Sequence, residues 1–446
     1  MKVRVMKFGG TSVQTKEARH TAALKVISAK EQGYSPVVVV SAIGRKGEPY
    51  ATDTLIALLR EIDPAVEPDP REMDLLMACG EILSSVVFAH TLKTLGQTAI
   101  SLRGGQAGIR TDGRYGNARI LGINPLGLRE ALQRGLIPVV CGFQGVGVEG
   151  GLPGAELTTL GRGGSDTSAS ALGAALKADR IEIYTDVDGV KTADPRMVVN
   201  APTLRKVTYD EVAEIAHLGA KVVHPRAAEI AMRFDCPLWV KNTFTDDEGT
   251  EIVPRERFPG RRVTGVTHSG KLVYVSASLE CVEPALRVDL AARVYETLAK
   301  HSINLFMINL SPDSIGFAVQ RDQYSELLHV FDGLVVPLGQ GAIYVVQAGF
   351  TPSQGAASQL ELMRAMDPKA VPLTVTEGCT MVSVVGHDYM QQAGVFLDVL
   401  TLFQGAQIPV LQTSDSDFSL SCLIPESELN KAVRLLHDGF GLSQEK

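Results

Sequence analysis

The sequence predicts an α/β protein, in which a mainly parallel sheet sandwiched by helices is followed by two ferredoxin-like α+β modules. Three observations support this prediction. Short apolar runs alternate with helical stretches over roughly the first 240 residues. One of these runs is four consecutive valines at 37–40, which is typical of a strand buried on both faces. Beyond residue 264 the order becomes strand–helix–strand–strand, and this order occurs twice.

The first part of the chain is expected to form one domain, residues 1–245. Its predicted strands are 2–8, 37–40, 97–102, 136–141, 180–185 and 238–241, and its clearest predicted helices are 18–29 and 168–177. Glycine-rich turns follow several of these strands. Because α/β proteins bind ligands at the carboxyl ends of their strands, we expect the functional residues in these turns.

A polar, charged segment rich in proline separates the two parts, and we expect a linker at 246–264. The first module is then 265–350 and the second 375–446. Their predicted strands are 272–278, 304–310, 315–319, 380–385, 408–413 and 418–424. Their predicted helices are 286–300, 393–404 and 427–437.

Composition limits the function. The length of 446 residues favours two or three domains. The net charge is −7 and the basic residues are dispersed, which argues against a nucleic-acid surface. The six cysteines lack zinc spacing and are expected to be buried thiols in a reducing cytoplasm. No apolar run of bilayer length and no signal segment is apparent, so we expect a cytoplasmic protein without a membrane partner.

The first candidate motif is KFGGTS, at residues 7–12, directly after the first predicted strand. Glycines there let backbone N–H groups approach a phosphate, and the helix that follows points its positive end at it. Lys7 is a cation able to neutralise charge on a transferring phosphoryl group. If the motif stood alone, a tight glycine turn with a surface lysine would be the favoured interpretation.

A second anion-binding loop is predicted at 158–167, TTLGRGGSDT, ahead of a helix. Arg162 carries the planar fork that grips a carboxylate bidentately. Asp166 is an unusual neighbour for a phosphate because like charges repel. It could hold a lysine in place or be an ordinary helix N-cap; the two roles are compatible, and the residues leave both alternatives open.

Four further residues are candidates for a functional site. Thr185 and Asp186 end a predicted strand, where they could meet the adenine or ribose of a nucleotide. Lys221 is a second lysine, ahead of a helix expected to begin at Pro225. Glu81 lies in apolar surroundings, where a carboxylate is more often structural. The literal GxGxxG at 145–150 is a false match to a dinucleotide site, because the next residues forbid a helix.

Taken in order, these motifs resemble the aspartate kinases of the amino-acid-kinase superfamily. The resemblance runs through residues 7–12, 41–42, 79–81, 142–145, 158–167, 185–188 and 219–225. It covers essentially the whole chain, since the tail resembles the paired ACT domains of such enzymes. The motifs at 7–12 and 161–167 are the specific ones. The first domain is accordingly expected to be an amino-acid-kinase catalytic domain and the two modules ACT-like regulatory modules.

The resemblance implies a role for each matching position. Lys7 would stabilise the transferring phosphoryl group and Asp166 would orient it. Glu81 would pair with the α-ammonium of aspartate, Arg162 would clamp its carboxylates, and two hydroxyls, Ser41 and Thr52, would face the substrate. The implied ATP-binding residues are Lys7, Gly9, Gly10, Ser12, Gly163, Gly164, Ser165, Thr185, Asp186, Lys191 and Lys221. Magnesium would accompany ATP, without metal ligands that the sequence identifies.

The implied activity is ATP-dependent phosphorylation of the aspartate side chain to 4-phospho-L-aspartate, the first step of lysine, threonine and methionine (diaminopimelate) biosynthesis. An amino-acid effector would act through the ACT tail of a homo-oligomer. Alternatives are another amino-acid kinase or a non-catalytic amino-acid sensor. Three departures from the family stand out: Lys191 in place of a tyrosine beside the adenine, an insertion at 45–51, and the absence of an Asp-x-Pro-Gly turn at 280–284.

Overall fold

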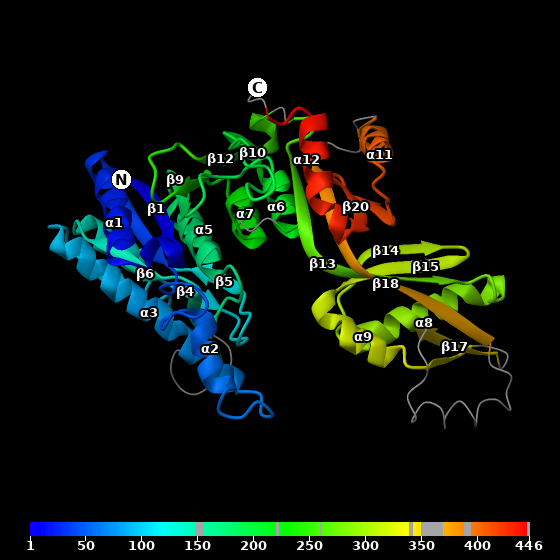
Figure 1. Ribbon diagram of the computed structural model, residues 1–446. Coiled ribbons are helices and arrows are strands. Elements are labelled where there is room, and N and C mark those ends of the chain that lie inside the picture. The colour runs from blue at the N-terminus through cyan, green and yellow to red at the C-terminus, as the bar shows by residue number, and fades with distance from the viewer. Residues whose placement is uncertain are drawn as a thin grey trace. The chain divides into compact units, whose positions relative to one another are not determined.

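The computed structural model describes residues 1–147, 156–219, 223–258, 261–338, 342–348, 369–387 and 394–443 (Figure 1). The chain forms two compact units. The first comprises Met1–Pro195 and Asn200–Thr264, and the second comprises Arg196–Val199 and Gly265–Ser443. The predicted α/β class is confirmed, with a mainly parallel sheet in the first unit and α+β layers in the second.

The main sheet of the first unit has eight strands in the order β10-β12-β11-β9-β1-β2-β6-β3. They are β1 (Lys2–Phe8), β2 (Tyr34–Val40), β3 (Ala99–Leu102), β6 (Ile137–Cys141), β9 (Arg180–Thr185), β10 (Lys206–Thr208), β11 (Leu238–Asn242) and β12 (Thr250–Val253). Every pairing in this order is parallel except that of β11 with β12. The carboxyl ends of β1, β2 and β9 therefore meet at one edge.

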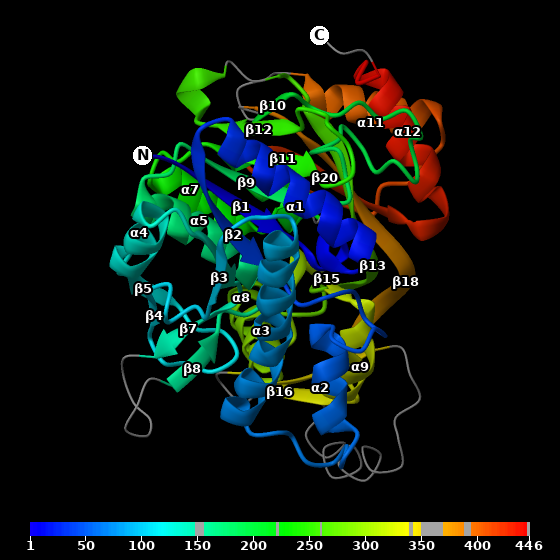
Figure 2. The same ribbon diagram turned by 90° about the vertical axis from the view of Figure 1, so that its left-hand side faces the viewer.

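Helices cover both faces of this sheet (Figure 2). On one face, α1 (Lys16–Glu31) and α3 (Pro70–Thr94) form a core with alternate residues of β1, including Met6 and Phe8. Lys7, between them, points to the opposite face. That face contacts α5 (Gly164–Leu176), which packs in turn on α7 (Pro225–Arg233). The other helices are α2 (Thr52–Arg60), α4 (Leu126–Gln133) and α6 (Tyr209–His217).

A smaller sheet, ordered β5-β4-β7-β8, belongs to the same unit. Its strands are β4 (Ile109–Thr111), β5 (Ile120–Ile123), β7 (Gln144–Gly147) and β8 (Glu156–Thr159). Gly145 and Gly147, from the literal GxGxxG, lie within β7, which pairs antiparallel with β8. They are strand residues, as expected of a false match to the dinucleotide fingerprint.

The second unit is built around two long strands, β13 (Gly265–Ser278) and β18 (Lys369–Val385). Its other strands are β14 (Phe306–Ser311), β15 (Ser314–Gln320), β16 (Leu334–Pro337), β17 (Ile343–Ala348), β19 (Gln412–Asp415) and β20 (Ser419–Pro425). Its helices are α8 (Arg287–Lys300), α9 (Tyr324–Val330), α11 (Val395–Gly405) and α12 (Leu429–Gly439). The sheet order is β14-β15-β13-β18-β17-β16, with β20 beside β18 and β19 beside β20.

The long strands differ from the predicted module boundaries. Residues 265–268 of β13 pair with 382–385 of β18, beside β20, whereas 274–277 pair with 373–376, beside β17. Irregular register between these stretches allows each strand to pass from one half of the sheet to the other. One half is therefore built from the continuous stretch 272–376, whereas the other joins 265–268 to 379–425, so the two modules are interleaved along the chain.

Two expectations about individual segments also differ. The segment 246–264, expected to be a linker, contains β12, a strand of the main sheet. Among the described helices, α3 is long and apolar enough to cross a membrane by length and composition, although no such run was expected from the sequence. Half of its most apolar window is buried in the first unit, where α3 packs on α1, β3 and β6.

Candidate active site

Lys7 and Asp166 form an ion pair at the carboxyl end of β1. Lys7 Nζ lies 2.6 Å from Asp166 Oδ1, and both side chains are largely buried. The N-cap of α5 is Gly163, so Asp166 lies in the first turn and is not the N-cap. Its second oxygen, Oδ2, accepts from the backbone N–H of His224 at 3.4 Å. Of the two alternatives for Asp166, the geometry supports the one in which it holds a lysine.

Glycines leave space beside this ammonium group. A Cβ at Gly9 would lie 3.6 Å from Lys7 Nζ, so a side chain there would occupy the approach to the lysine. At Gly10 a Cβ would come within 2.4 Å of the carbonyl oxygen of Gly44, because the two backbones touch. The N–H of Gly44 donates to the Gly10 carbonyl at 3.1 Å. Ser12, one turn further, is buried and hydrogen-bonds Thr243 at 2.7 Å.

Glu81 approaches the same edge from α3. Its side chain is buried, and Oε1 accepts from the backbone N–H of Ala42 at 3.0 Å. Oε2 has no hydrogen-bond partner among the described residues. Burial raises the pKa of the Glu81 carboxyl to about 8, and the Ala42 hydrogen bond opposes only part of that effect. A buried carboxylate with one open oxygen is suited to a cationic ligand.

The two predicted substrate hydroxyls lie close to these groups along the chain. Ser41 follows β2, and its N–H donates to the Phe8 carbonyl at 3.1 Å, beside Lys7. Thr52 is the first residue of α2. The Tyr50 carbonyl oxygen lies 3.2 Å from the Cβ position of Gly80, so the segment entering α2 packs on α3 next to Glu81.

Arg162 lies at the tip of a turn that its neighbours force into shape. Gly161 and Gly163 both have left-handed backbones, with φ of 74° and 71°. A Cβ at Gly163 would come 2.0 Å from the His224 ring, so only glycine fits there. Arg162 is exposed and has no ion pair or hydrogen bond within the described part of the chain. Its guanidinium is therefore available to a ligand.

The predicted nucleotide residues are partly engaged with one another. Asp186, after β9, forms an ion pair with Arg45, and the Thr185 hydroxyl donates to Asp186 at 3.1 Å. Lys191 lies 3.5 Å from Asp188 and donates to Thr203 at 3.1 Å. Lys221 falls outside the described residues. Gly9 N–H donates to the Tyr184 carbonyl at 3.3 Å, which places the end of β9 beside the glycine turn.

A cavity of about 200 Å³ lies between α1 and the main sheet, on the face opposite to the one that Lys7 points to. It is lined by Arg4, near the start of β1, and Arg180, the first residue of β9, among others. The predicted site residues gather instead at the carboxyl ends of the same strands. The candidate site is therefore defined by its residues and not by this cavity.

Asp74 and His224 were missed by the sequence analysis. His224 contributes a backbone N–H to Asp166 and a ring that shapes the Arg162 turn. Asp74 is buried on α3 and accepts hydrogen bonds from the strand that leads into that turn. One signal was present in the sequence. Asp74 precedes Glu81 by seven residues, so the two carboxylates share one face of an apolar helix.

A parallel sheet with a lysine and glycine turns at its carboxyl edge is the arrangement of an enzyme that binds phosphate groups. The model of the amino acid kinase family matches residues 2–242, and an ACT domain model matches 374–438. Aspartokinase 1 of Bacillus subtilis is 37% identical over 450 residues, spanning 100% of both chains. The aspartokinase of Mycolicibacterium smegmatis is 36% identical over 99% of this chain and 97% of that protein.

Solved structures agree. Aspartokinase III of E. coli, in complex with aspartate and ADP, superposes with a TM-score of 0.70 at 24% identity, covering 98% of this chain and 99% of that one. The aspartate kinase of Synechocystis has a TM-score of 0.64 at 26% identity, covering 99% of each. The chain belongs to the aspartokinases, within the amino acid kinase family. The resemblance seen in the sequence is confirmed.

Proposed function

We propose that the chain transfers the γ-phosphoryl group of ATP to the side-chain carboxylate of aspartate at the carboxyl edge of its main sheet. The observation that carries this proposal is the convergence of three elements. β1 pairs with β2, and the Ala42 N–H, just after β2, donates to the Glu81 side chain. These contacts bring together the Lys7–Asp166 pair, the open approach at Gly9 and the Glu81 oxygen that lacks a partner among the described residues.

Lys7 is the proposed catalytic residue. In the reaction, an oxygen of the aspartate side chain forms a bond to the γ-phosphorus while the bond to the β,γ-bridging oxygen breaks, and ADP leaves. Negative charge is spread over the transferring group, and a fixed ammonium beside it lowers the barrier. Asp166 Oδ1 lies 2.6 Å from Lys7 Nζ, so the ammonium is oriented before the substrate binds.

The amino-acid end of aspartate would be held by charge on two sides. Glu81 would accept the α-ammonium through its open oxygen. Arg162 would grip a carboxylate with the two-pronged geometry that only a guanidinium offers. Ser41 and Thr52 are assigned to the substrate as hydroxyl donors. Glutamate would then be a poor substrate, because one more methylene moves its carboxylate away from Lys7.

The residues at the end of β1 fit nucleotide phosphates. Gly9 and Gly10 leave no side chain between Lys7 and an approaching phosphate, and the turn is held by the Gly44 contacts. With them we group Ser12, Gly163, Gly164, Ser165, Thr185, Asp186, Lys191 and Lys221 as the ATP-binding set. Magnesium, when bound with ATP, neutralises phosphate charge and would be held mainly by the phosphates, since Asp186 pairs with Arg45.

Regulation is assigned to the second unit. Its sheet carries an ACT domain at 374–438, and we propose that an end-product amino acid of the aspartate pathway binds there in a cytoplasmic homo-oligomer. An effector acts on a distant site only through its different affinity for two states of the protein. Titration of lysine, threonine, methionine and diaminopimelate against initial rates tests this. Absence of any binding by calorimetry would leave the unit as a scaffold.

Two substitutions test the catalytic assignment. Lys7→Ala should lower kcat by roughly 100-fold or more, with a smaller effect on the KM for aspartate. Arg162→Lys should chiefly raise the KM for aspartate, because an ammonium cannot form the bidentate fork. The product is trapped as a hydroxamate from aspartate or glutamate with Mg-ATP. A normal kcat in Lys7→Ala, or equal rates with glutamate, would refute the assignment.

A further inference from the structure

Asp74 is buried yet is not surrounded by cations. Its carboxylate accepts from the Thr159 N–H and the Thr159 hydroxyl, each at 2.7 Å, and from the Gly116 N–H at 2.9 and 3.0 Å. All of these donors are neutral. The side chain has no exposed surface. One carboxylate on α3 therefore joins two segments that are 42 and 85 residues away in the sequence.

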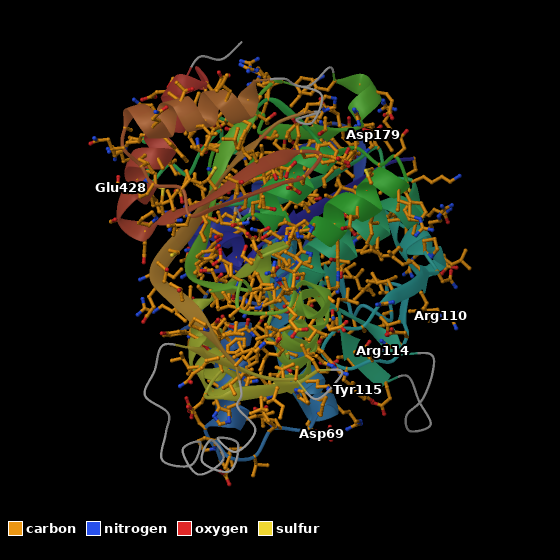
Figure 3. The ribbon with its side chains drawn as sticks, turned by 90° about the vertical axis from the view of Figure 1, so that its right-hand side faces the viewer. Asp69, Arg110, Arg114, Tyr115, Asp179 and Glu428 are labelled. Carbon is orange, nitrogen blue, oxygen red and sulfur yellow. The ribbon has the colours of Figure 1, made fainter. Side chains whose placement is uncertain are left out.

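The two segments that Asp74 joins also contact each other. The Ala118 N–H donates to the Thr159 carbonyl at 2.8 Å. Figure 3 labels Arg114 and Tyr115, just before Gly116, at the same corner of the first unit as Asp69, the N-cap of α3. The carboxylate thus closes a junction between the start of α3, the loop at 112–118 and the end of β8.

This junction leads directly into the Arg162 turn. Thr159 is the last residue of β8 and lies three residues before Arg162. The Arg226 guanidinium of α7 donates to the Leu160 carbonyl at 3.1 Å and to Asn117 Oδ1 at 2.9 Å, so the turn is also held from its other side. Gly161 packs against Asn117, whose Oδ1 would lie 2.8 Å from a Cβ there.

We propose that Asp74 is a positioning residue for the aspartate substrate: through Thr159 and Gly116 it sets the backbone from which Arg162 reaches the substrate carboxylate. The inference rests on the role proposed for Arg162. Arg162 has no described protein partner of its own, so its place is set by the backbone on either side. A displacement of about 1 Å at such a group can cost as much as 100-fold in rate.

The chemistry of the junction favours a carboxylate. Three N–H or O–H groups point at its two oxygens, and an ionised carboxyl accepts from all three without turning a donor of its own toward any of them. An amide would turn its own donors toward one of them, although its shape is the same. Burial raises the pKa of Asp74, and the bonds from Gly116 and Thr159 act in the opposite direction.

The same helix also carries Glu81. Seven residues of α-helix separate the two carboxylates by about 10 Å. One rigid element therefore places Glu81 directly and Arg162 through Asp74. The α-ammonium and the carboxylate of the substrate are then both positioned from α3. This accounts for the two buried carboxylates on so long and apolar a helix.

The test uses the full chain with Asp74→Asn, and with Thr159→Val as a milder change that removes one donor and keeps the backbone. We expect Asp74→Asn to raise the KM for aspartate roughly 10-fold and Thr159→Val a few-fold, with the KM for ATP within about twofold. The matched control is Arg71→Gln. Arg71 also ties α3 to β8, through Glu156 at 3.1 Å, but at the far end of that strand.

A double-mutant cycle with Arg162→Lys separates positioning from general damage. If Asp74 acts through Arg162, the effects on the KM for aspartate will be less than additive. Additive effects, a proportional rise in the KM for ATP, or the same selectivity in Arg71→Gln would overturn the inference. If Arg162→Lys raises the KM but neither Asp74→Asn nor Thr159→Val does, only this inference fails. If Arg162→Lys leaves the KM for aspartate unchanged, the role proposed for Arg162 fails, and this inference fails with it.

Discussion

Two regions of α3 use the same chemical group in opposite ways. Near its start, Asp74 is buried and accepts from Gly116 and Thr159. Two turns later, Glu81 is also buried, but among the described residues it accepts from Ala42 alone and keeps one oxygen without a partner. Burial raises the pKa of both carboxyls. The difference teaches that a buried carboxylate with a full set of donors is structural, whereas one with an open oxygen is suited to a ligand.

The energetic reason lies in how many hydrogen bonds the folded protein supplies to each carboxylate. A buried ionised group is costly unless hydrogen bonds replace its water. At Asp74 the protein supplies those bonds itself. At Glu81 it does not, and the pKa of about 8 reflects this. The ammonium of the substrate would donate to the open oxygen of Glu81. Binding would then offset part of the cost of burying this carboxylate without water.

The largest effect is expected at Glu81, the carboxylate suited to a ligand. Glu81→Gln keeps the shape and removes the charge, so the KM for aspartate should rise about 100-fold, the scale for losing a buried charge-assisted bond. The KM for ATP is the internal control, measured by initial rates. A change in the aspartate KM of less than about threefold would mean that Glu81 is structural like Asp74.

The next largest effect is expected at Asp74, and it concerns the stability of the protein. Asp74→Asn should lower the free energy of unfolding by about 1–3 kcal/mol, since buried donors lose their acceptor. Glu81→Gln should not lower it at pH 8 or above, because there the wild-type protein carries an under-solvated carboxylate. Urea unfolding of both variants at one pH measures the contrast. Equal losses would erase the distinction between the two sites.

The pH dependence should follow from Glu81. Its folded-state pKa, about 8, lies above the ordinary value of 4.5, so its ionisation opposes folding and stability should decline as pH rises through that range. Aspartate binding needs the ionised form, so its KM should fall by up to about 10-fold per pH unit toward pH 8 and then level off. Glu81→Gln should abolish the slope. A wild-type KM that is flat from pH 6 upward contradicts this assignment.

The smallest effect is expected at Arg71. Its contact with Glu156 is partly exposed and shared with Glu72, so solvent weakens it. Arg71→Gln should reduce stability less than Asp74→Asn does and leave aspartate kinetics unchanged. Thermal unfolding and the aspartate KM, measured side by side, check this. A loss as large as that of Asp74→Asn would show that any anchor of β8 to α3 matters equally.

The sequence by itself determined the local elements and the family. The bounds predicted for β1 and β9, 2–8 and 180–185, are those of the structure, because apolar runs bounded by polar or glycine residues are a local signal. The turn at Gly9 after β1 and the start of α7 at Pro225 were also predicted, because glycine and proline are local signals. The motifs at Lys7 and Arg162 were sufficient to indicate an aspartokinase.

Only the tertiary structure decided which groups meet. Asp74 accepts hydrogen bonds from Thr159 and Gly116 across long stretches of chain that no periodicity connects. The interleaving of β13 and β18 was missed because strand pairing depends on register between distant segments, which alternation along one strand does not specify. The contrast between Asp74 and Glu81 has the same origin. Hydrogen-bond partners and burial set the state of a carboxylate, and both exist only once the chain is folded.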